Sequence, residues 1–228
     1  MWRSTLVGML ILGTPVVGQA EELAFYYGAT VAKGYVSRGI IYTEDVYVSP
    51  WVELGYGNFY AGAYLSNVDE FFVFDAYSMS NGVYVGYRSS AGDVSYDATL
   101  YYYIYDGAND TSPNYFELVL DAAFAPTPST YLTAEVVLDK EYDSRIGSLR
   151  LDYYTPVENL SVGVEYGRAN TNYGDWDYGI IDASYSLNSN ISLGLAYNYS
   201  TYEFNSPDAD FNYDDPAQLV TASINFSF

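Results

Sequence analysis

The last ten residues of the chain, 219–228, constrain its fold more than any other stretch. Every second residue from Val220 to Phe228 is apolar, and most of the residues between them are small and polar. Side chains alternate across a strand, so this segment has one apolar face. An apolar strand with a free edge invites aggregation, whereas a closed barrel needs such a strand to pair with its first one. We therefore expect the closing strand of a barrel; the alternative is the last strand of a soluble sandwich.

The composition favours a membrane barrel over a helical membrane protein. Mean hydropathy is only -0.06, although 50% of the residues are hydrophobic. After residue 20 no apolar run is long enough for a membrane-spanning helix, but strands that alternate apolar and polar residues can cross a bilayer. The 29 tyrosines combine an apolar ring with a polar tip, which suits the interface between lipid and water.

The charge and the missing residue types exclude several functions. The net charge of -21 would repel a phosphate backbone, so we expect no nucleic-acid partner. The chain contains no cysteine and no histidine. It therefore lacks thiolate chemistry, the commonest general base and the commonest ligand of transition metals. We expect no enzyme activity, no cofactor and no metal site.

Residues 1–20 are typical of a secretory signal peptide. Arg3 supplies a positive charge, an interrupted apolar stretch covers 6–17, and Ala20 ends a short segment suited to cleavage. The apolar stretch is too short for a membrane anchor. We expect a mature chain, residues 21–228, that forms one outer-membrane β-barrel.

From Leu23 onward the chain divides into twelve segments that alternate apolar and polar residues and are separated by turn-forming residues. An even number of strands is the rule for single-chain bacterial barrels. The pattern predicts an all-β fold, a transmembrane antiparallel up-and-down β-barrel of about 12 strands. The predicted strands are 23–37, 46–57, 58–67, 73–89, 93–105, 114–124, 129–139, 145–155, 160–169, 177–187, 190–202 and 217–228.

The lengths of the connections indicate how the barrel is oriented. Tight turns rich in Gly, Pro, Asn and Ser alternate with longer polar stretches. Outer-membrane barrels have short periplasmic turns and longer outer loops, so we place both termini in the periplasm. The longer connections are predicted at 39–45, 68–72, 106–113, 140–144, 170–176 and 203–216.

The alternation within the strands separates a lipid face from a lumen face. The apolar face carries no charge, as contact with hydrocarbon requires, because a charge at mid-depth costs roughly 2–4 kcal/mol. The opposite face carries small residues, tyrosines and single ionisable groups. The predicted lumen-lining ionisable residues are Glu53, Arg88, Asp97, Glu117, Asp121, Glu135, Arg150, Asp152, Glu165 and Asp182.

Acids outnumber bases in this set. A ring of carboxylates in a narrow lumen raises the local concentration of cations, so the set indicates a pore that prefers cations. The alternative is a network of ion pairs that fills a closed lumen, in which Arg150 could pair with Glu135 or Glu165. A barrel of about 12 strands lies between filled barrels of about 8 strands and open porins of about 16. Both alternatives therefore stay open. The tyrosines predicted to face inward narrow the space in either case; they are Tyr84, Tyr101, Tyr103 and Tyr131.

Two motifs in the first third of the mature chain resemble the TorF family of Gram-negative outer-membrane proteins, which are expected to act as porins. Members carry Tyr-Val-x-Arg-Gly at the end of the first strand and Phe-Tyr-x-Gly, then Ser-Asn-x-Asp, along the third. The matching residues are Tyr35, Arg38, Gly39, Phe59, Tyr60, Gly62, Ser66, Asn67 and Asp69. The resemblance implies an outer-membrane barrel with a pore and adds little about its substrate.

Arg38 is expected where the first strand meets an outer loop. Its side chain could line a constriction at the mouth of a pore, or it could pin the loop by binding carboxylates. Loop pinning is the simpler expectation, because it needs no substrate.

These features lead to two hypotheses for function. The first is an outer-membrane, porin-like channel for passive diffusion of small solutes, with a preference for cations. The alternative is a closed barrel with a structural, adhesion or surface-recognition role, carried by acidic outer loops. In both cases the expected partners are outer-membrane lipid and lipopolysaccharide. The C-terminal strand ending at Phe228 also resembles the signal that the barrel-assembly machinery binds.

Overall fold

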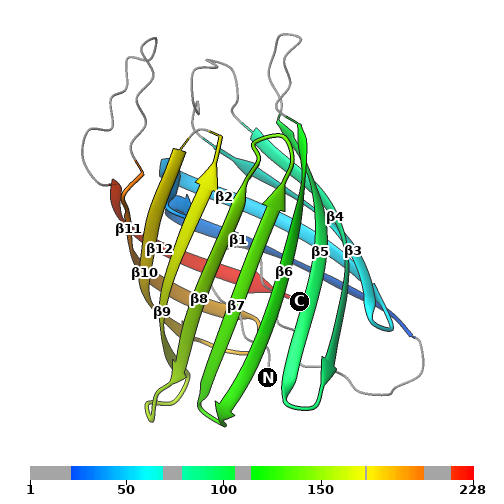
Figure 1. Ribbon diagram of the computed structural model, residues 1–228. Coiled ribbons are helices and arrows are strands. Elements are labelled where there is room, and N and C mark those ends of the chain that lie inside the picture. Colours follow the sequence, from blue (N-terminus) through cyan, green and yellow to red (C-terminus); the bar gives the residue numbers. More distant parts are fainter. Residues whose placement is uncertain (1–21, 69–78, 106–113, 173, 203–216) are drawn as a thin grey trace.

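The computed structural model describes residues 22–68, 79–105, 114–172, 174–202 and 217–228. These residues form a closed antiparallel β-barrel in which each strand pairs with its neighbours in sequence and the last strand pairs with the first (Figure 1). The predicted all-β barrel of 12 strands is confirmed. In this part of the chain, no helix has the length and apolarity needed to cross a membrane. The strands are β1 (Leu23–Ser37), β2 (Ile40–Tyr56), β3 (Phe59–Asn67), β4 (Met79–Ala91), β5 (Val94–Tyr105), β6 (Tyr115–Thr127), β7 (Thr130–Asp139), β8 (Arg145–Tyr154), β9 (Leu160–Thr171), β10 (Gly174–Ser186), β11 (Ile191–Ser200) and β12 (Ala217–Ser227).

The barrel closes where β12 (red in Figure 1) lies beside β1 (blue). Val31 and Ile224 are directly opposite each other in this antiparallel ladder. The backbones of Tyr27 and Phe228 donate hydrogen bonds to each other, and their rings stack with centroids 5.3 Å apart. The segment that the sequence predicted as the closing strand therefore occupies that position.

The outer surface of the barrel is apolar. On β11, Leu195 is 56% exposed, whereas the residues before and after it, Gly194 and Ala196, are half-buried and buried. The other strands repeat this alternation, because valine, leucine and aromatic residues at every second position face outward. A continuous apolar exterior of this kind suits hydrocarbon rather than water.

Aromatic and charged side chains mark the two edges of the apolar band. At the end with the short turns, Tyr87 packs against Phe59 with ring centroids 5.0 Å apart and stacks on Tyr96 at 6.4 Å. Toward the opposite end, the exposed Arg168 forms an ion pair of 3.6 Å with Asp177. Aromatic girdles at the membrane interface and charges beyond it are expected of a barrel that spans a bilayer.

Two of the predicted loops are wrong. Residues 40–45 of the predicted loop 39–45 belong to β2, and Ser37 pairs directly with Ile40 across the turn. The predicted loop 170–176 is also too long, because β9 continues to Thr171 and β10 begins at Gly174. At 170–176 strand pairing continues through mostly polar residues, whereas 40–45 begins with two isoleucines and a tyrosine, which suit a strand.

Other boundaries agree with the sequence analysis or fall outside the described residues. The connection 140–144 joins β7 to β8 as predicted. The predicted strand 73–89 is described from Met79 onward. The predicted loops 106–113 and 203–216, most of the predicted loop 68–72, and the predicted signal peptide 1–20 lie outside the described residues.

A charge introduced into the apolar band should be costly only at mid-depth. Leu195 lies near the middle of β11, and Leu187 follows the end of β10 in a short turn; they are 56% and 53% exposed. We expect Leu195→Arg to lower the free energy of unfolding by roughly 2–4 kcal/mol and Leu187→Arg by about 0–1 kcal/mol. Guanidinium unfolding in lipid vesicles measures both values. Equal costs would contradict a lipid-facing band.

Candidate functional site in the barrel lumen

All ten predicted lumen residues lie on the inner face of the barrel. None of them is more than 25% exposed, whereas the residues on either side of them in the strands face outward. Arg38, which was expected where the first strand meets an outer loop, also lies inside. In this set of eleven residues, eight carboxylates face three arginines, which leaves an excess of five negative charges.

The first network of ion pairs extends from β2 to β5. Arg88 of β4 binds Glu53 of β2 at 3.1 Å and Asp97 of β5 at 3.5 Å. The guanidinium of Arg88 also lies 3.6 Å from the centre of the Tyr60 ring. The hydroxyls of Tyr60 and Tyr84 donate hydrogen bonds to Asp97 and Glu53. Buried charges of this kind are stable only when they are paired, so the network fixes the arrangement of these side chains.

The second network extends from β8 to β10. Arg150 binds Asp152 and Asp182 at 2.8 Å each and Glu165 at 3.6 Å. The pair of Arg150 with Glu165 was one of two that the sequence suggested, and the two residues are direct partners of β8 and β9. The other suggested partner, Glu135, binds Arg38 instead at 3.3 Å. Register explains this difference, because the residue of β8 opposite Glu135 is a serine.

The tip of the β1–β2 hairpin, residues 34–43, lies inside the lumen, and we call it the inner hairpin. None of its ten residues is exposed. The pairing of β1 with β12 ends at Lys33, and the pairing of β1 with β2 is irregular between Lys33 and Val36. Gly34 has a φ of 80° at this point, which glycine adopts without steric cost. The hairpin therefore leaves the wall of the barrel at Gly34.

Arg38 holds the inner hairpin against the far side of the lumen. Its guanidinium binds Glu117 of β6 at 2.9 Å and Glu135 of β7 at 3.3 Å. Its backbone carbonyl accepts a hydrogen bond of 2.8 Å from the indole nitrogen of Trp176 on β10. Arg38 thus binds carboxylates, as expected of a pinning residue, but these carboxylates belong to the lumen. β1 ends at Ser37, so Arg38 stands where the first strand meets its connection, as expected, but this connection lies in the lumen and not in an outer loop.

Gly39 lets the inner hairpin pack tightly against β10 and β11. Its φ is 83°, and a Cβ atom at this position would collide with the side chains of Ser200 and Tyr178. The tip therefore touches β10 and β11 through Gly39 and reaches β6 and β7 through Arg38. It spans the lumen between these two parts of the wall.

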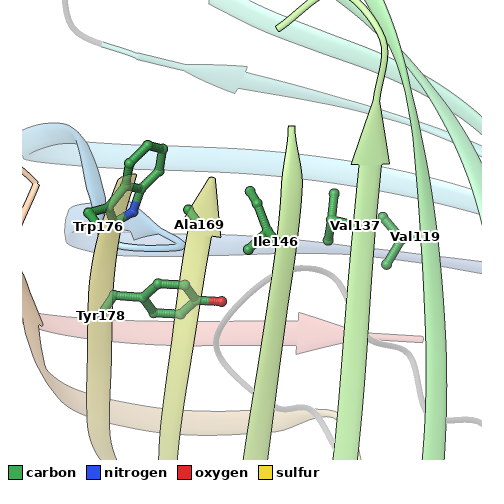
Figure 2. Close-up of a cluster of buried hydrophobic side chains, with 6 residues drawn as sticks. All are labelled: Val119, Val137, Ile146, Ala169, Trp176 and Tyr178. Atoms are coloured by element: carbon green, nitrogen blue, oxygen red, sulfur yellow. The ribbon is translucent and has the colours of Figure 1, made fainter. Parts of the chain in front are cut away.

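An apolar cluster faces the inner hairpin from the barrel wall. Figure 2 shows its side chains in a row across β6 to β10, and Ile40 of the inner hairpin packs against the cluster. The members are Val119, Val137, Ile146, Ala169, Trp176 and Tyr178. Sequence alternation places these positions in the lumen but treats that face as polar. It therefore could not predict an apolar contact there.

Tyrosines occupy much of the remaining inner surface. Of those predicted to point inward, Tyr84 is buried, Tyr103 donates a 3.0 Å hydrogen bond to Glu117, and Tyr101 packs against the apolar cluster. Tyr60, which the sequence analysis named only as a motif residue, and Tyr178, which it did not name, are also buried. Both belong to the inward-facing parity of their strands, which was the available signal.

Most residues of the two family motifs have a structural role that the described contacts explain. Tyr35 stacks on Tyr47 with ring centroids 4.3 Å apart. The Ser66 hydroxyl donates to a backbone carbonyl of β4. The side-chain amide of Asn67 exchanges two hydrogen bonds of 2.6 Å with the backbone of β2, beyond the last residue pair of that ladder. Asp69 lies outside the described residues.

A closed antiparallel barrel with an apolar exterior and a charged interior defines this chain as a porin-like β-barrel. No protein-family model matches the sequence, and no curated protein matches it either. Among solved structures, the KdgM porin is similar with a TM-score of 0.62 and 10% identity over 89% of this chain and 99% of that chain.

Two further solved structures support the same fold. The NanC porin is similar with a TM-score of 0.57 and 10% identity over 90% of this chain and 99% of that chain. A KdgM porin in complex with disordered oligogalacturonate gives a TM-score of 0.58, again with 10% identity, over 90% of this chain and 98% of that chain. At this identity the likeness is one of fold.

The packing at Gly39 can be tested by comparing its substitution with that of a glycine whose φ is also positive but which has open space around it. Gly57 also has a positive φ, 58°, and a Cβ atom there would meet nothing within 4 Å. An alanine with positive φ costs roughly 1–2 kcal/mol at either position. Overpacking against Ser200 and Tyr178 should add about 1–3 kcal/mol for Gly39→Ala. Guanidinium unfolding of both variants measures the difference, and equal values would place the tip away from β10 and β11.

Proposed function

We propose that this protein is a channel through which small solutes cross the outer membrane by passive diffusion, with a preference for cations. The observation that carries the proposal is the charge of the lumen, where eight carboxylates face three arginines. In a narrow space with walls of low dielectric constant, a negative excess attracts cations and repels anions. The porin-like fold supports a channel, and the lumen charge supports its preference.

The inner hairpin supports a narrow channel. It occupies the lumen between β10 and β6, and Arg38 ties it to both sides. A barrel of about 12 strands is narrower than the open porins of about 16 strands, and the hairpin takes up part of its interior. Inorganic ions and small organic solutes fit such a path, whereas large solutes do not.

The same charge argues against acidic sugars as substrates. One porin of similar fold was solved with oligogalacturonate, which is a polyanion. In the present lumen each arginine is bound by at least two carboxylates. A polyanion would therefore meet few free cationic groups on the inner wall and an excess of negative charge.

The proposal includes a location and a family. The apolar band with its aromatic edge supports insertion in the outer membrane of a Gram-negative bacterium, in contact with lipid and lipopolysaccharide. The pairing of β12 with β1 supports assembly through the C-terminal strand. The positions of Tyr35, Arg38 and Gly39 in the inner hairpin support membership of the TorF family, because the first motif then has a defined task.

A second candidate function is a closed barrel with a structural, adhesion or surface-recognition role. The observation that favours it is the contact of Ile40 with the apolar cluster, since a dry contact inside the lumen blocks water. Planar-bilayer recordings separate the two candidates. A current whose reversal potential in a KCl gradient has the sign of cation selectivity supports the channel. If the purified protein carries no measurable current at any voltage or salt concentration, the closed barrel is supported.

The inner hairpin should limit the conductance. Arg38→Gln removes the ion pairs to Glu117 and Glu135 that hold the tip. We expect the single-channel conductance to rise, because the tip is then held only by its packing and by the bond to Trp176. We also expect a stronger cation preference, because two carboxylates lose their partner.

Two control variants separate the hairpin from the charge. Arg88→Gln also removes one positive charge from the lumen and leaves Glu53 and Asp97 without their partner, but Arg88 has no ion pair with the inner hairpin. It should raise the cation preference in bilayer recordings with a smaller gain in conductance. Arg168→Gln, on the outer surface, should leave both quantities unchanged. Equal gains for Arg38→Gln and Arg88→Gln would show that charge alone, and not the hairpin, sets the conductance.

A further inference from the structure

Three carboxylates lie side by side on the inner faces of β5, β6 and β7. Asp97 is directly opposite Asp121, and Asp121 is directly opposite Glu135. The Cβ atoms of residues paired in this way are about 4.5–5.5 Å apart. The three side chains therefore form a row across the strands, which we call the acid row.

The outer members of the acid row are neutralised and the middle member is not. Asp97 binds Arg88 at 3.5 Å, and Glu135 binds Arg38 at 3.3 Å. Asp121 is only 7% exposed, and its Oδ1 atom is buried without a hydrogen-bond partner. Both arginines are already bound by two other carboxylates each, so neither is available to Asp121 alone.

The surroundings of Asp121 are negative as a whole. The strongest charge effects on it come from three acids, Glu135, Asp97 and Glu165, and one base, Arg38. A buried carboxylate without a counter-charge is strongly unfavourable, and neighbouring acids add to the cost. Either a cation from outside the chain or a bound proton would remove it.

We propose that Asp121 is the central ligand of a cation-binding site in the lumen, which takes a monovalent inorganic cation or a primary ammonium group. Asp97 and Glu135, which remain bound to their arginines, would add negative charge beside the site without acting as ligands. Among the residues described, no group of three acids is arranged to hold a metal ion, so the acid row is not a cage for a divalent metal. The site deepens the proposed function, because a permeating cation is the ligand that would reach it.

The matched control for Asp121 is Asp152, an inner acid in a different network. When Asp152 is replaced by asparagine, Arg150 keeps its contacts with Asp182 and Glu165. Asp152→Asn and Asp121→Asn thus remove the same charge from the lumen. Only Asp121→Asn removes the carboxylate that lacks a partner.

Cation binding can be measured by stability, without any current. The wild type and both variants are unfolded in lipid vesicles at fixed chloride concentration and ionic strength, with potassium, sodium, methylammonium or N-methylglucamine as the cation. We expect a saturable rise of the unfolding midpoint with potassium, sodium or methylammonium over the bulky N-methylglucamine. The rise should persist in Asp152→Asn and disappear in Asp121→Asn.

The choice of cation identifies the ligand class. A rise with the metal ions alone assigns the site to inorganic cations, and a rise with methylammonium alone assigns it to organic ammonium groups. A midpoint that is the same for all four cations in the wild type overturns the proposal. So does a cation effect that survives in Asp121→Asn. Stabilisation by Asp121→Asn in every salt would mean that the carboxyl group binds a proton instead.

Bilayer recordings of the same three proteins keep this proposal apart from the proposed function. We expect the ratio of cation to anion permeability to fall more in Asp121→Asn than in Asp152→Asn. If the wild type carries no current but its unfolding midpoint rises with particular cations, the cation site is supported and the channel is not. If it carries a cation-selective current but its unfolding midpoint does not depend on the cation, the channel is supported and the cation site is not.

Discussion

Closure of the backbone ladder is the constraint on which the rest of this structure depends. Hydrocarbon offers no partner to a free N–H or C=O group, so a sheet can cross a membrane only when its last strand pairs with its first. The ladder between β12 and β1, with Val31 opposite Ile224, meets this requirement. Once no edge is free, every second side chain can face lipid without inviting aggregation, which permits the exposed leucines and valines of the outer band.

The same closure creates an interior that the chain has to fill with satisfied groups. Arg88 and Arg150 do this within the wall, because Arg88 binds acids of β2 and β5 and Arg150 binds an acid of β9. Arg38 does it from the inner hairpin and joins parts of the chain that are far apart in sequence, as its bonds to Glu117 and Glu135 show. Loss of one arginine leaves two or more buried carboxylates unpaired, which costs far more than the net contribution of the pairs.

Alternation predicted the strands and the inner face well, because both follow from the period of two. β1 has the predicted bounds, and Glu53 and Asp182 point inward as their parity requires. Parity does not say which inner residues meet, so the choice between Glu135 and Glu165 for Arg150 depended on a register that only the structure gives.

The inner hairpin lay beyond sequence reasoning for a related reason. Residues 34–37 were assigned to a strand and 39–43 to a loop, and the contacts of the hairpin with β6, β7 and β10 are tertiary. Gly34 was the one local signal, because a glycine inside a strand often marks a bulge or a close approach of the backbone. Strands β6 and β7 then carry two tasks at once. Glu117 and Glu135 hold the inner hairpin through Arg38, and Asp121, directly opposite Glu135, supplies unbalanced negative charge. The same pair of strands thus sets both the width of the proposed path and the charge along it. A substitution there that widens the path also changes its charge.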